Sequence, residues 1–251
     1  VPFLRCLMSS RKNLHEYKLK YPYPRRRFIR RALKSGIALA ASLITNYRIE
    51  GQENLPKGGP LLIIGNHFHF LDSIGPIHST DYLLEFINDA VMPNAPAAMK
   101  FLPDLWGTFK ILQGTANLEA MRASEAVLAQ GGVLAIFPEG HVHRLPLGKP
   151  LPGASFLALR SGVPILPIGT YSEDEWDLFG ALTRKKRRAR IITRIGKPFG
   201  PLAAGSLDKI PGREEVKAAG WEIMSRIAEL LPAHARGIYG SSLQGLELSA
   251  N

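Results

Sequence analysis

Hydrophobic and polar positions alternate along the chain in segments that predict strands and helices in turn from residue 48 onwards. Short apolar runs next to glycine, proline or asparagine predict buried strands, and apolar residues every three or four positions predict helices. The expected strands are YRIEG (47–51), PLLIIGN (60–66), VLAIFPEG (133–140), VPILPIGTY (163–171) and ARIITRIGKPF (189–199), and the expected helices are 117–130, 154–162 and 213–231. This alternation predicts an α/β fold with a mixed, mostly parallel sheet flanked by helices.

An N-terminal amphipathic helix is predicted over residues 26–47, after a polar segment (1–24) without clear periodicity. The apolar residues that share one face are Ile29, Leu33, Ile37, Ala40 and Ile44. The basic residues expected on the opposite face are Arg27, Arg30, Arg31 and Lys34. This pattern is typical of a helix that lies on a membrane surface. An ordinary surface helix packed on the core has the same pattern, so both interpretations stay open.

Composition narrows the classes of partner. The chain has 251 residues, enough for one well-buried domain, and a net charge of +11 that favours nucleic acid, an anionic membrane or a phosphorylated substrate. Its one cysteine, Cys6, excludes an internal disulfide framework and a cysteine-based zinc site, and fits a reducing compartment. The best apolar run, at 37–45, is far shorter than the roughly 20 residues that span a bilayer, and no secretory signal is expected.

Polar residues follow two of the predicted strands at the point where each strand ends. NHFHFLD (66–72) follows one and FPEGH (137–141) ends another. Ligands of open α/β sheets bind beyond the carboxyl ends of strands. We therefore expect a pocket formed by His67, Asp72, Glu139 and His141. A single histidine after a strand is more often structural, so the combination carries this expectation.

Four motifs in order resemble the phospholipid/glycerol acyltransferases, whose best-known members are the 1-acylglycerol-3-phosphate acyltransferases. The blocks are N-H-x4-D at Asn66, His67 and Asp72, GTFKILQ at 107–113, FPEGH at 137–141, and VPILP at 163–167. The resemblance covers residues 48–200 and implies an acyltransferase domain over 48–251. The basic amphipathic pattern predicts a membrane-associating segment over 1–47 before it. It implies transfer of a fatty acyl group from an acyl thioester, on coenzyme A or acyl carrier protein, to a lipid hydroxyl.

The resemblance also assigns roles to residues, without a metal or another cofactor. His67 is the implied general base, and Asp72 orients its imidazole, as the acid does in a Ser-His-Asp triad. Glu139 and Gly140 are implied to bind the lipid acceptor, and Lys100 is a candidate phosphate contact.

Two positions depart from the family pattern. Gln113 stands where the family has an arginine thought to bind the acceptor phosphate, and His141 stands where it has serine or threonine. The planar guanidinium fork is therefore missing at one expected place. Either Arg144 or Lys149 supplies the charge instead, or the acceptor is not a simple glycerol phosphate.

The expected partners are the lipid acceptor, the thioester donor and an anionic membrane, with peripheral or monotopic attachment at the cytoplasmic face. The basic run TRKKRRAR (183–190) follows apolar residues at 176–182, a combination that suits an anionic interface. No aromatic-interleaved recognition signature accompanies it, so no nucleic-acid partner is expected. The rival enzyme class is a metal-dependent hydrolase in which HFH (67–69) and HVH (141–143) join Asp72 and Glu139 as ligands.

Overall fold

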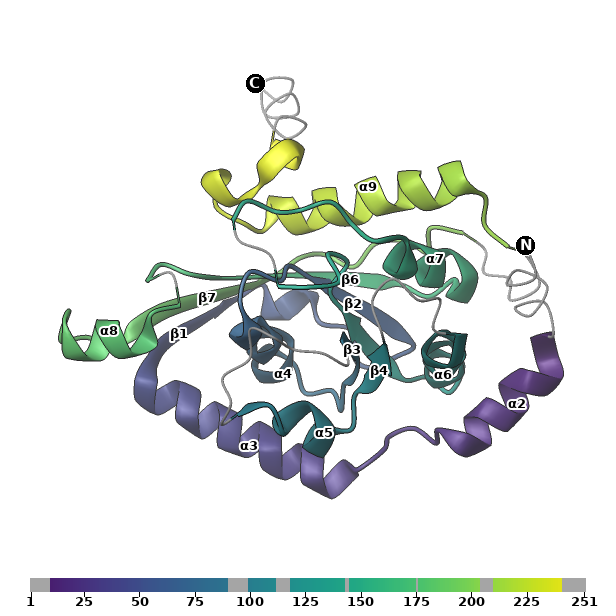
Figure 1. Cartoon of the computed structure of the whole chain (residues 1–251), viewed down its shortest axis with the longest axis horizontal. Helices are drawn as coiled ribbons and strands as arrows, with labels where there is room; N and C mark the ends of the chain where they lie inside the picture. The colour runs from purple at the N-terminus through teal and green to yellow at the C-terminus, as the bar shows by residue number, and fades with distance from the viewer. Residues whose placement is uncertain are drawn as a thin grey trace.

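The computed structural model describes residues 10–89, 99–111, 118–142, 145–174, 176–203 and 210–240. A seven-stranded sheet forms its centre, in the order β1-β7-β6-β2-β5-β3-β4 (Figure 1). The strands are β1 (Thr45–Glu50), β2 (Leu61–Gly65), β3 (Glu85–Asp89), β4 (Phe109–Ile111), β5 (Val133–Ile136), β6 (Ile165–Ser172) and β7 (Ala189–Ile195). Among these strands, β6 and β7 pair antiparallel, and the other neighbours are parallel. The predicted mixed, mostly parallel sheet is confirmed.

Helices cover both faces of this sheet. The described α-helices are α2 (Ser10–Lys20), α3 (Arg27–Ile44), α4 (Ile74–Ser79), α5 (Leu102–Trp106), α6 (Leu118–Leu128), α7 (Pro152–Ser161), α8 (Leu178–Thr183) and α9 (Arg213–Glu229). In Figure 1, α9 lies on one side of the sheet and α3 and α5 lie on the other. Among the described residues, no helix combines the length and the hydrophobicity needed to cross a membrane.

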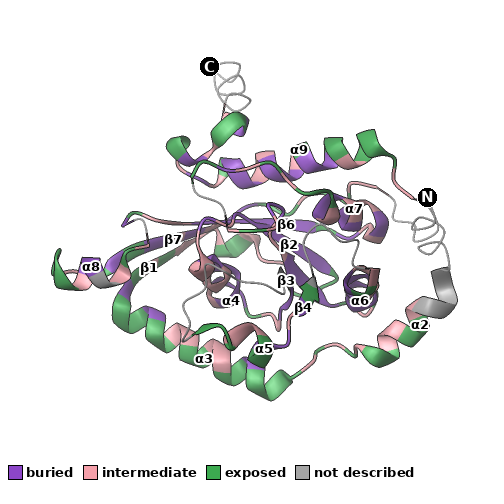
Figure 2. Ribbon diagram, in the orientation of Figure 1, coloured by how far each residue is buried: buried purple, intermediate pink, exposed green. Residues whose placement is uncertain are grey.

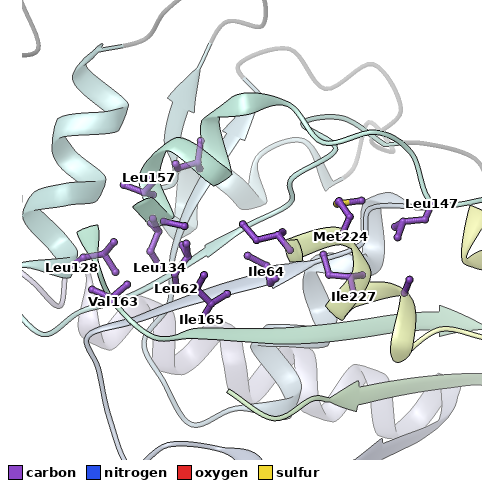
Figure 3. Packing of buried hydrophobic residues seen from close by; sticks show 14 of the residues in the cluster. Leu62, Ile64, Leu128, Leu134, Leu147, Leu157, Val163, Ile165, Met224 and Ile227 are labelled. Carbon is purple, nitrogen blue, oxygen red and sulfur yellow. The ribbon is translucent and has the colours of Figure 1, made fainter. Parts of the chain in front are cut away.

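The central strand β2 shows why the chain needs both layers of helices. Its alternate residues Leu62 and Ile64 pack into one core cluster with α6, α7 and α9, part of which Figure 3 shows. Leu61 and Ile63 pack into a second cluster with residues of α3, α4 and α5. All four side chains are at most 1% exposed. A strand buried on both faces has an unbroken apolar sequence, as LLIIG does.

Helix α3 packs on the core through a face that differs from the predicted one. Arg30, expected on an exposed basic face, is fully buried and donates to both oxygens of Glu85 at 2.6 and 2.7 Å. Arg25 donates to the same carboxylate at 2.5 Å. A buried carboxylate needs such paired donors, so the assignment of Arg30 to the solvent face was wrong. Lys34 is also half-buried and donates to the carbonyl oxygen of Thr80.

Much of α3 is exposed to solvent (Figure 2), and its exposed residues include large apolar side chains. Phe28 is 83% exposed, Leu39 62% and Leu43 61%. Leu39 and Leu43 are one helical turn apart, so they share a face. Leu33 and Ile37, which the periodicity grouped with Ile44, pack against the core instead. The helix therefore has a packed face held by ion pairs and a separate exposed apolar face.

Helix α2 was not predicted, because it lies in the N-terminal segment that lacks clear periodicity. This helix packs against α6. At its end, Lys20 and Tyr21 both donate to Glu119 of α6, at 2.5 and 2.6 Å. Its hydrophobic residues are too few to make a periodic pattern, so its position is set by contacts with α6.

Candidate active site

The two strand ends predicted to share a crevice meet in the structure. Strands β2 and β5 are parallel neighbours, with Ile64 opposite Ile136. Each runs directly into its motif, so both motifs emerge at the same edge of the sheet. The backbone N–H of His67 donates to Oε2 of Glu139 at 2.7 Å, which ties the first motif to the third.

His67 and Asp72 face each other across a tight turn. Nδ1 of His67 lies 3.7 Å from Oδ2 of Asp72. The turn is a short 3-10 helix, Phe70–Ser73, that begins after His69. Oδ2 of Asp72 accepts from the N–H of His69 at 2.7 Å, and Nδ1 of His69 accepts from the N–H of Leu71 at 3.2 Å. This reciprocal capping brings the aspartate back beside His67.

The carboxylate of Asp72 has an unusual environment for an acid. It is fully buried, and burial raises its pKa to about 6, against the opposing effects of His67 and of the backbone N–H groups of Phe68 and His69. Its Oδ1 and Nδ1 of His67 are buried without a hydrogen-bond partner among the described residues. At 3.7 Å the pair is longer than a hydrogen bond. A small rotation of the imidazole would give its buried nitrogen the missing partner.

The third motif also supports the imidazole ring. The rings of His67 and Phe137 stack, with centroids 4.5 Å apart and planes at 16°. Phe137 in turn lies beside Phe86 of β3, with 6.4 Å between ring centroids. A Cβ on Gly65 would lie 3.2 Å from the Phe137 ring, so the end of β2 suits a residue without a side chain. His67 is thus held on one side by packing, and the carboxylate of Asp72 faces it on another.

Asn66 fastens the first motif to the neighbouring strand β6. Its amide donates to the carbonyl oxygen of Thr170 at 2.7 Å, and its Oδ1 accepts from the N–H of Thr170 at 2.8 Å. The Thr170 hydroxyl is 3.0 Å from that of Thr193, which is 2.6 Å from the Tyr47 hydroxyl. A network in which buried polar groups satisfy one another makes a rigid base for the turn that carries His67. Sequence reasoning missed Thr170, Thr193 and Tyr47, which no motif marks.

Glu139 and Gly140 shape the loop of the third motif. Glu139 is buried, and its two oxygens accept from the N–H of His67 and, at 2.8 Å, from the N–H of Gly148. Gly140 has a φ of +74°, a conformation that favours glycine. A Cβ there would lie 2.2 Å from Leu151, so close packing also requires glycine.

The remaining predicted site residues are either exposed or outside the described residues. Lys100 and His141 are exposed. Gln113 and Arg144 lie outside the described residues.

The histidine pairs of the metal alternative do not gather ligands. His69 stacks on Trp176, with ring centroids 5.3 Å apart, while the His67 ring stacks on Phe137. His143 lies outside the described residues. Within the part of the chain that the structure describes, no group of three or more His, Cys, Asp or Glu side chains could hold a metal ion. The hydrolase alternative therefore gains no support.

Comparison with known proteins identifies the family. A family model described as Acyltransferase matches residues 46–171, just over half of the 251-residue chain, and spans all four motifs. The chain belongs to the acyltransferase family. A solved structure similar in fold is the 1-acyl-sn-glycerophosphate (LPA) acyltransferase PlsC from Thermotoga maritima, with 20% sequence identity and a TM-score of 0.50. The match covers 93% of this chain and 88% of that one. The resemblance inferred from the motifs, and the prediction of an O-acyltransferase, are confirmed.

Proposed function

We propose that this acyltransferase moves a fatty acyl group from an acyl thioester to the hydroxyl of a lysophospholipid or a related lipid. The observation that carries the proposal is His67 facing the buried carboxylate of Asp72 at 3.7 Å, directly after a central strand. Both the family and the fold of PlsC support it. The thioester donor is acyl-coenzyme A or acyl carrier protein, and the reaction needs no further cofactor.

In the proposed reaction, Nε2 of His67 takes the proton of the acceptor hydroxyl while its oxygen attacks the thioester carbonyl. The tetrahedral intermediate then collapses, the C–S bond breaks, and the imidazolium returns the proton to the leaving thiolate. Asp72 holds the tautomer with hydrogen on Nδ1 and stabilises the imidazolium. The acceptor hydroxyl is the nucleophile, so no covalent acyl-enzyme forms.

Glu139 supports this chemistry through position. Because it is buried and both its oxygens accept backbone N–H groups, we assign it to tying the His67 turn to the backbone at Gly148. The direct acceptor contact that the resemblance implied for Glu139 stays a prediction. Lys100 and His141 are exposed and remain candidates for acceptor contact, with Gln113 and Arg144.

The function is tested with the purified full chain, an acyl thioester and lysophospholipid acceptors. We expect thiol release that depends on the acceptor, together with an acylated lipid seen by mass spectrometry. Thiol release without an acylated lipid would show a thioesterase, and the transfer proposal would be wrong.

Acceptor choice gives a first prediction at Gln113. Glutamine donates neutral hydrogen bonds of roughly 1 kcal/mol, against about 1.5–3 kcal/mol for a charged partner. We expect lysophosphatidic acid to be used poorly beside uncharged or zwitterionic hydroxyl lipids, and Gln113→Arg to raise its kcat/KM several-fold. Efficient use of lysophosphatidic acid by the native protein, with no gain from the arginine, would sink the altered-acceptor idea. Arg144 and Lys149 would then be the candidate phosphate contacts.

We also propose peripheral attachment at a membrane surface, through the exposed face of α3. Phe28, Leu39 and Leu43 supply the apolar contact. The net charge of +11 favours anionic lipids. The cytoplasmic face is proposed because the single cysteine fits a reducing compartment.

The attachment gives a second prediction. Leu39→Ser with Leu43→Ser should weaken vesicle binding at least tenfold, because each leucine buried in the interface contributes about 1.5–3 kcal/mol. Sedimentation with phosphatidylglycerol-containing vesicles measures it. Ile238→Ser, which removes an apolar side chain that is 51% exposed near α9, is the control. Equal binding by all three proteins would refute this placement. Deleting residues 1–47 is less informative, since it would strip buried Glu85 of Arg25 and Arg30.

A further inference from the structure

A hollow lies at the corner where α3 ends, β1 begins and β7 begins. Its volume is about 570 Å³. The residues that line it include Ser42, Asn46, His78, Arg187, Arg188 and Arg190. The register of the sheet explains the gathering, because β1 and β7 pair in parallel with Asn46 opposite Arg190. None of the lining residues belongs to the four family motifs, although Tyr47, which also lines the hollow, bonds to Thr193 in the network beneath the His67 turn.

The hollow is positively charged. Of the described residues, three arginines and no carboxylate line it. Arg187 is bound to Asp174 by two hydrogen bonds from its guanidinium, at 2.8 and 2.6 Å, which fixes the side chain but offsets its charge. Arg190 is held only loosely, 3.3 Å from Glu173 and with both side chains largely exposed.

Arg188 is the cation with the least compensation. Its guanidinium donates to the carbonyl oxygen of Ser42 at 2.9 Å, which anchors it to the last turn of α3. Among the described residues it forms no ion pair with a carboxylate. A guanidinium fork oriented by one backbone contact, with its charge uncompensated, suits the oxygens of a phosphate group.

Exposed apolar residues of α3 are close in sequence to the lining of the hollow. Leu39, Leu43 and Ile44 are 62%, 61% and 38% exposed; Leu39 comes one helical turn before Ser42, and Leu43 and Ile44 lie between Ser42 and Thr45. A phosphate bound among the arginines would therefore have solvent-exposed leucines beside it. Cations next to exposed aliphatic side chains match a lipid at the membrane surface, whose phosphate and acyl chains lie next to each other.

We propose that this hollow binds the phosphate of an anionic membrane lipid, through residues outside the four family motifs. The inference rests on the proposed membrane attachment and adds its specific lipid contact. Arg188 and Arg190 are the principal ligands, Asn46 supplies a neutral donor, and Arg187 shapes the wall. A lipid phosphate and a free phosphate present the same oxygens to the arginines. The exposed leucines of α3 favour the lipid, because only a lipid brings acyl chains with its phosphate.

The test compares the native full chain with a double variant that carries Arg188→Gln and Arg190→Gln. The substitution at position 190 keeps the backbone N–H that Arg190 donates to Asp174. The control, Arg213→Gln with Lys217→Gln, removes the same charge from exposed positions on α9, on the other side of the sheet (Figure 1). Vesicles of phosphatidylcholine, with and without phosphatidylglycerol, are sedimented with each protein. Each basic group near an anionic surface contributes about fivefold in binding, so the hollow variant should lose on the order of twentyfold with phosphatidylglycerol. The control should lose less than about twofold, as its charges lie farther than a Debye length from the surface.

Further measurements separate the ways in which the inference could fail. Equal losses in the two variants would overturn the phosphate site and leave attachment by net charge. If the native protein bound neither kind of vesicle, the membrane proposal itself would be wrong. Calorimetric titration with inorganic phosphate tests whether the hollow binds a soluble phosphate and not a lipid. Phosphate binding that only the hollow variant loses, with vesicle binding unchanged, would assign the hollow to a soluble phosphate and overturn the lipid assignment. Thermal unfolding of each variant checks that a loss does not come from misfolding.

Discussion

His67→Ala should lower the rate of acyl transfer by about 10²–10⁴ while the protein stays folded, because it removes the positioned base. The loss should appear in kcat, since the proton is transferred only as the hydroxyl attacks. Measuring thiol release against acceptor concentration separates kcat from KM. The stack on Phe137 is lost as well, so thermal unfolding of the variant must be recorded alongside.

The matched control is His234→Ala, which removes an exposed histidine from the short 3-10 helix that follows α9 and should leave the rate within about twofold. A His67→Ala protein that unfolds normally and keeps most of its activity would rule out His67 as the base. Activity lost to a chelator and restored by zinc would revive the hydrolase interpretation of the histidine pairs.

The meeting of the two strand-end motifs was predictable from sequence because it depends on a general property of parallel sheets. PLLIIG and VLAI are apolar runs short enough to be strands, and each leads into polar residues. Parallel strands end at the same edge, so the loops after two neighbouring strands lie close together. The contact between His67 and Glu139 is a consequence of β2 and β5 being neighbours.

The backbone contacts of Glu139 were not predictable, because they depend on which backbone groups the folded loops leave without partners. Its two oxygens meet the N–H groups of His67 and Gly148, and residue types say nothing about either. The same holds for the raised pKa of Asp72, which requires its burial to be known. Motifs identify residues, whereas burial and backbone geometry decide how those residues act.

The packing of α3 shows a second limit. Periodicity grouped Ile29, Leu33 and Ile37 on one face, yet Ile29 is 41% exposed while Arg30 is fully buried. Arginine is assigned to solvent from sequence because burying an unpaired charge is costly. Here Glu85, 55 residues away in sequence, removes that cost, and a pair so distant is invisible to helical spacing. Strand β3, which carries Glu85, went unpredicted because its charged residues interrupt the apolar run LLEFIND.

Asp72→Asn should separate activity from stability, lowering the first and raising the second. Asparagine has the same shape and can still accept from the N–H of His69, so the turn is preserved. Its amide cannot stabilise an imidazolium and favours the wrong tautomer of His67, so the rate should fall on the order of 10²–10⁴. Because the proposed catalysis requires a charged Asp72, the activity of the native protein should fall as the pH drops through about 6, where Asp72 becomes protonated.

The stability effect has the opposite sign because burial raises the pKa of Asp72 from 3.8 to about 6. Above pH 6 the folded protein holds a buried charge that the unfolded chain holds in water. The cost is about 3 kcal/mol, at about 1.4 kcal/mol for each pH unit of the pKa difference. It shrinks as the pH falls from 6 towards 4, where both states become protonated. Asp72→Asn should therefore be more stable than the native protein at pH 8, by up to this amount, and should lose most of that advantage near pH 4.

Denaturant unfolding of both proteins at pH 8 and near pH 4 measures this difference, with Asp81→Asn as the control. The Asp81 side chain is fully exposed and lies 3.4 Å from Lys34, a solvent-screened pair whose loss should leave stability nearly unchanged at either pH. A destabilised Asp72→Asn protein at pH 8 would mean that the contact with His67 outweighs the burial of the charge. A stabilised but inactive one would show that the fold tolerates a costly buried carboxylate that catalysis requires.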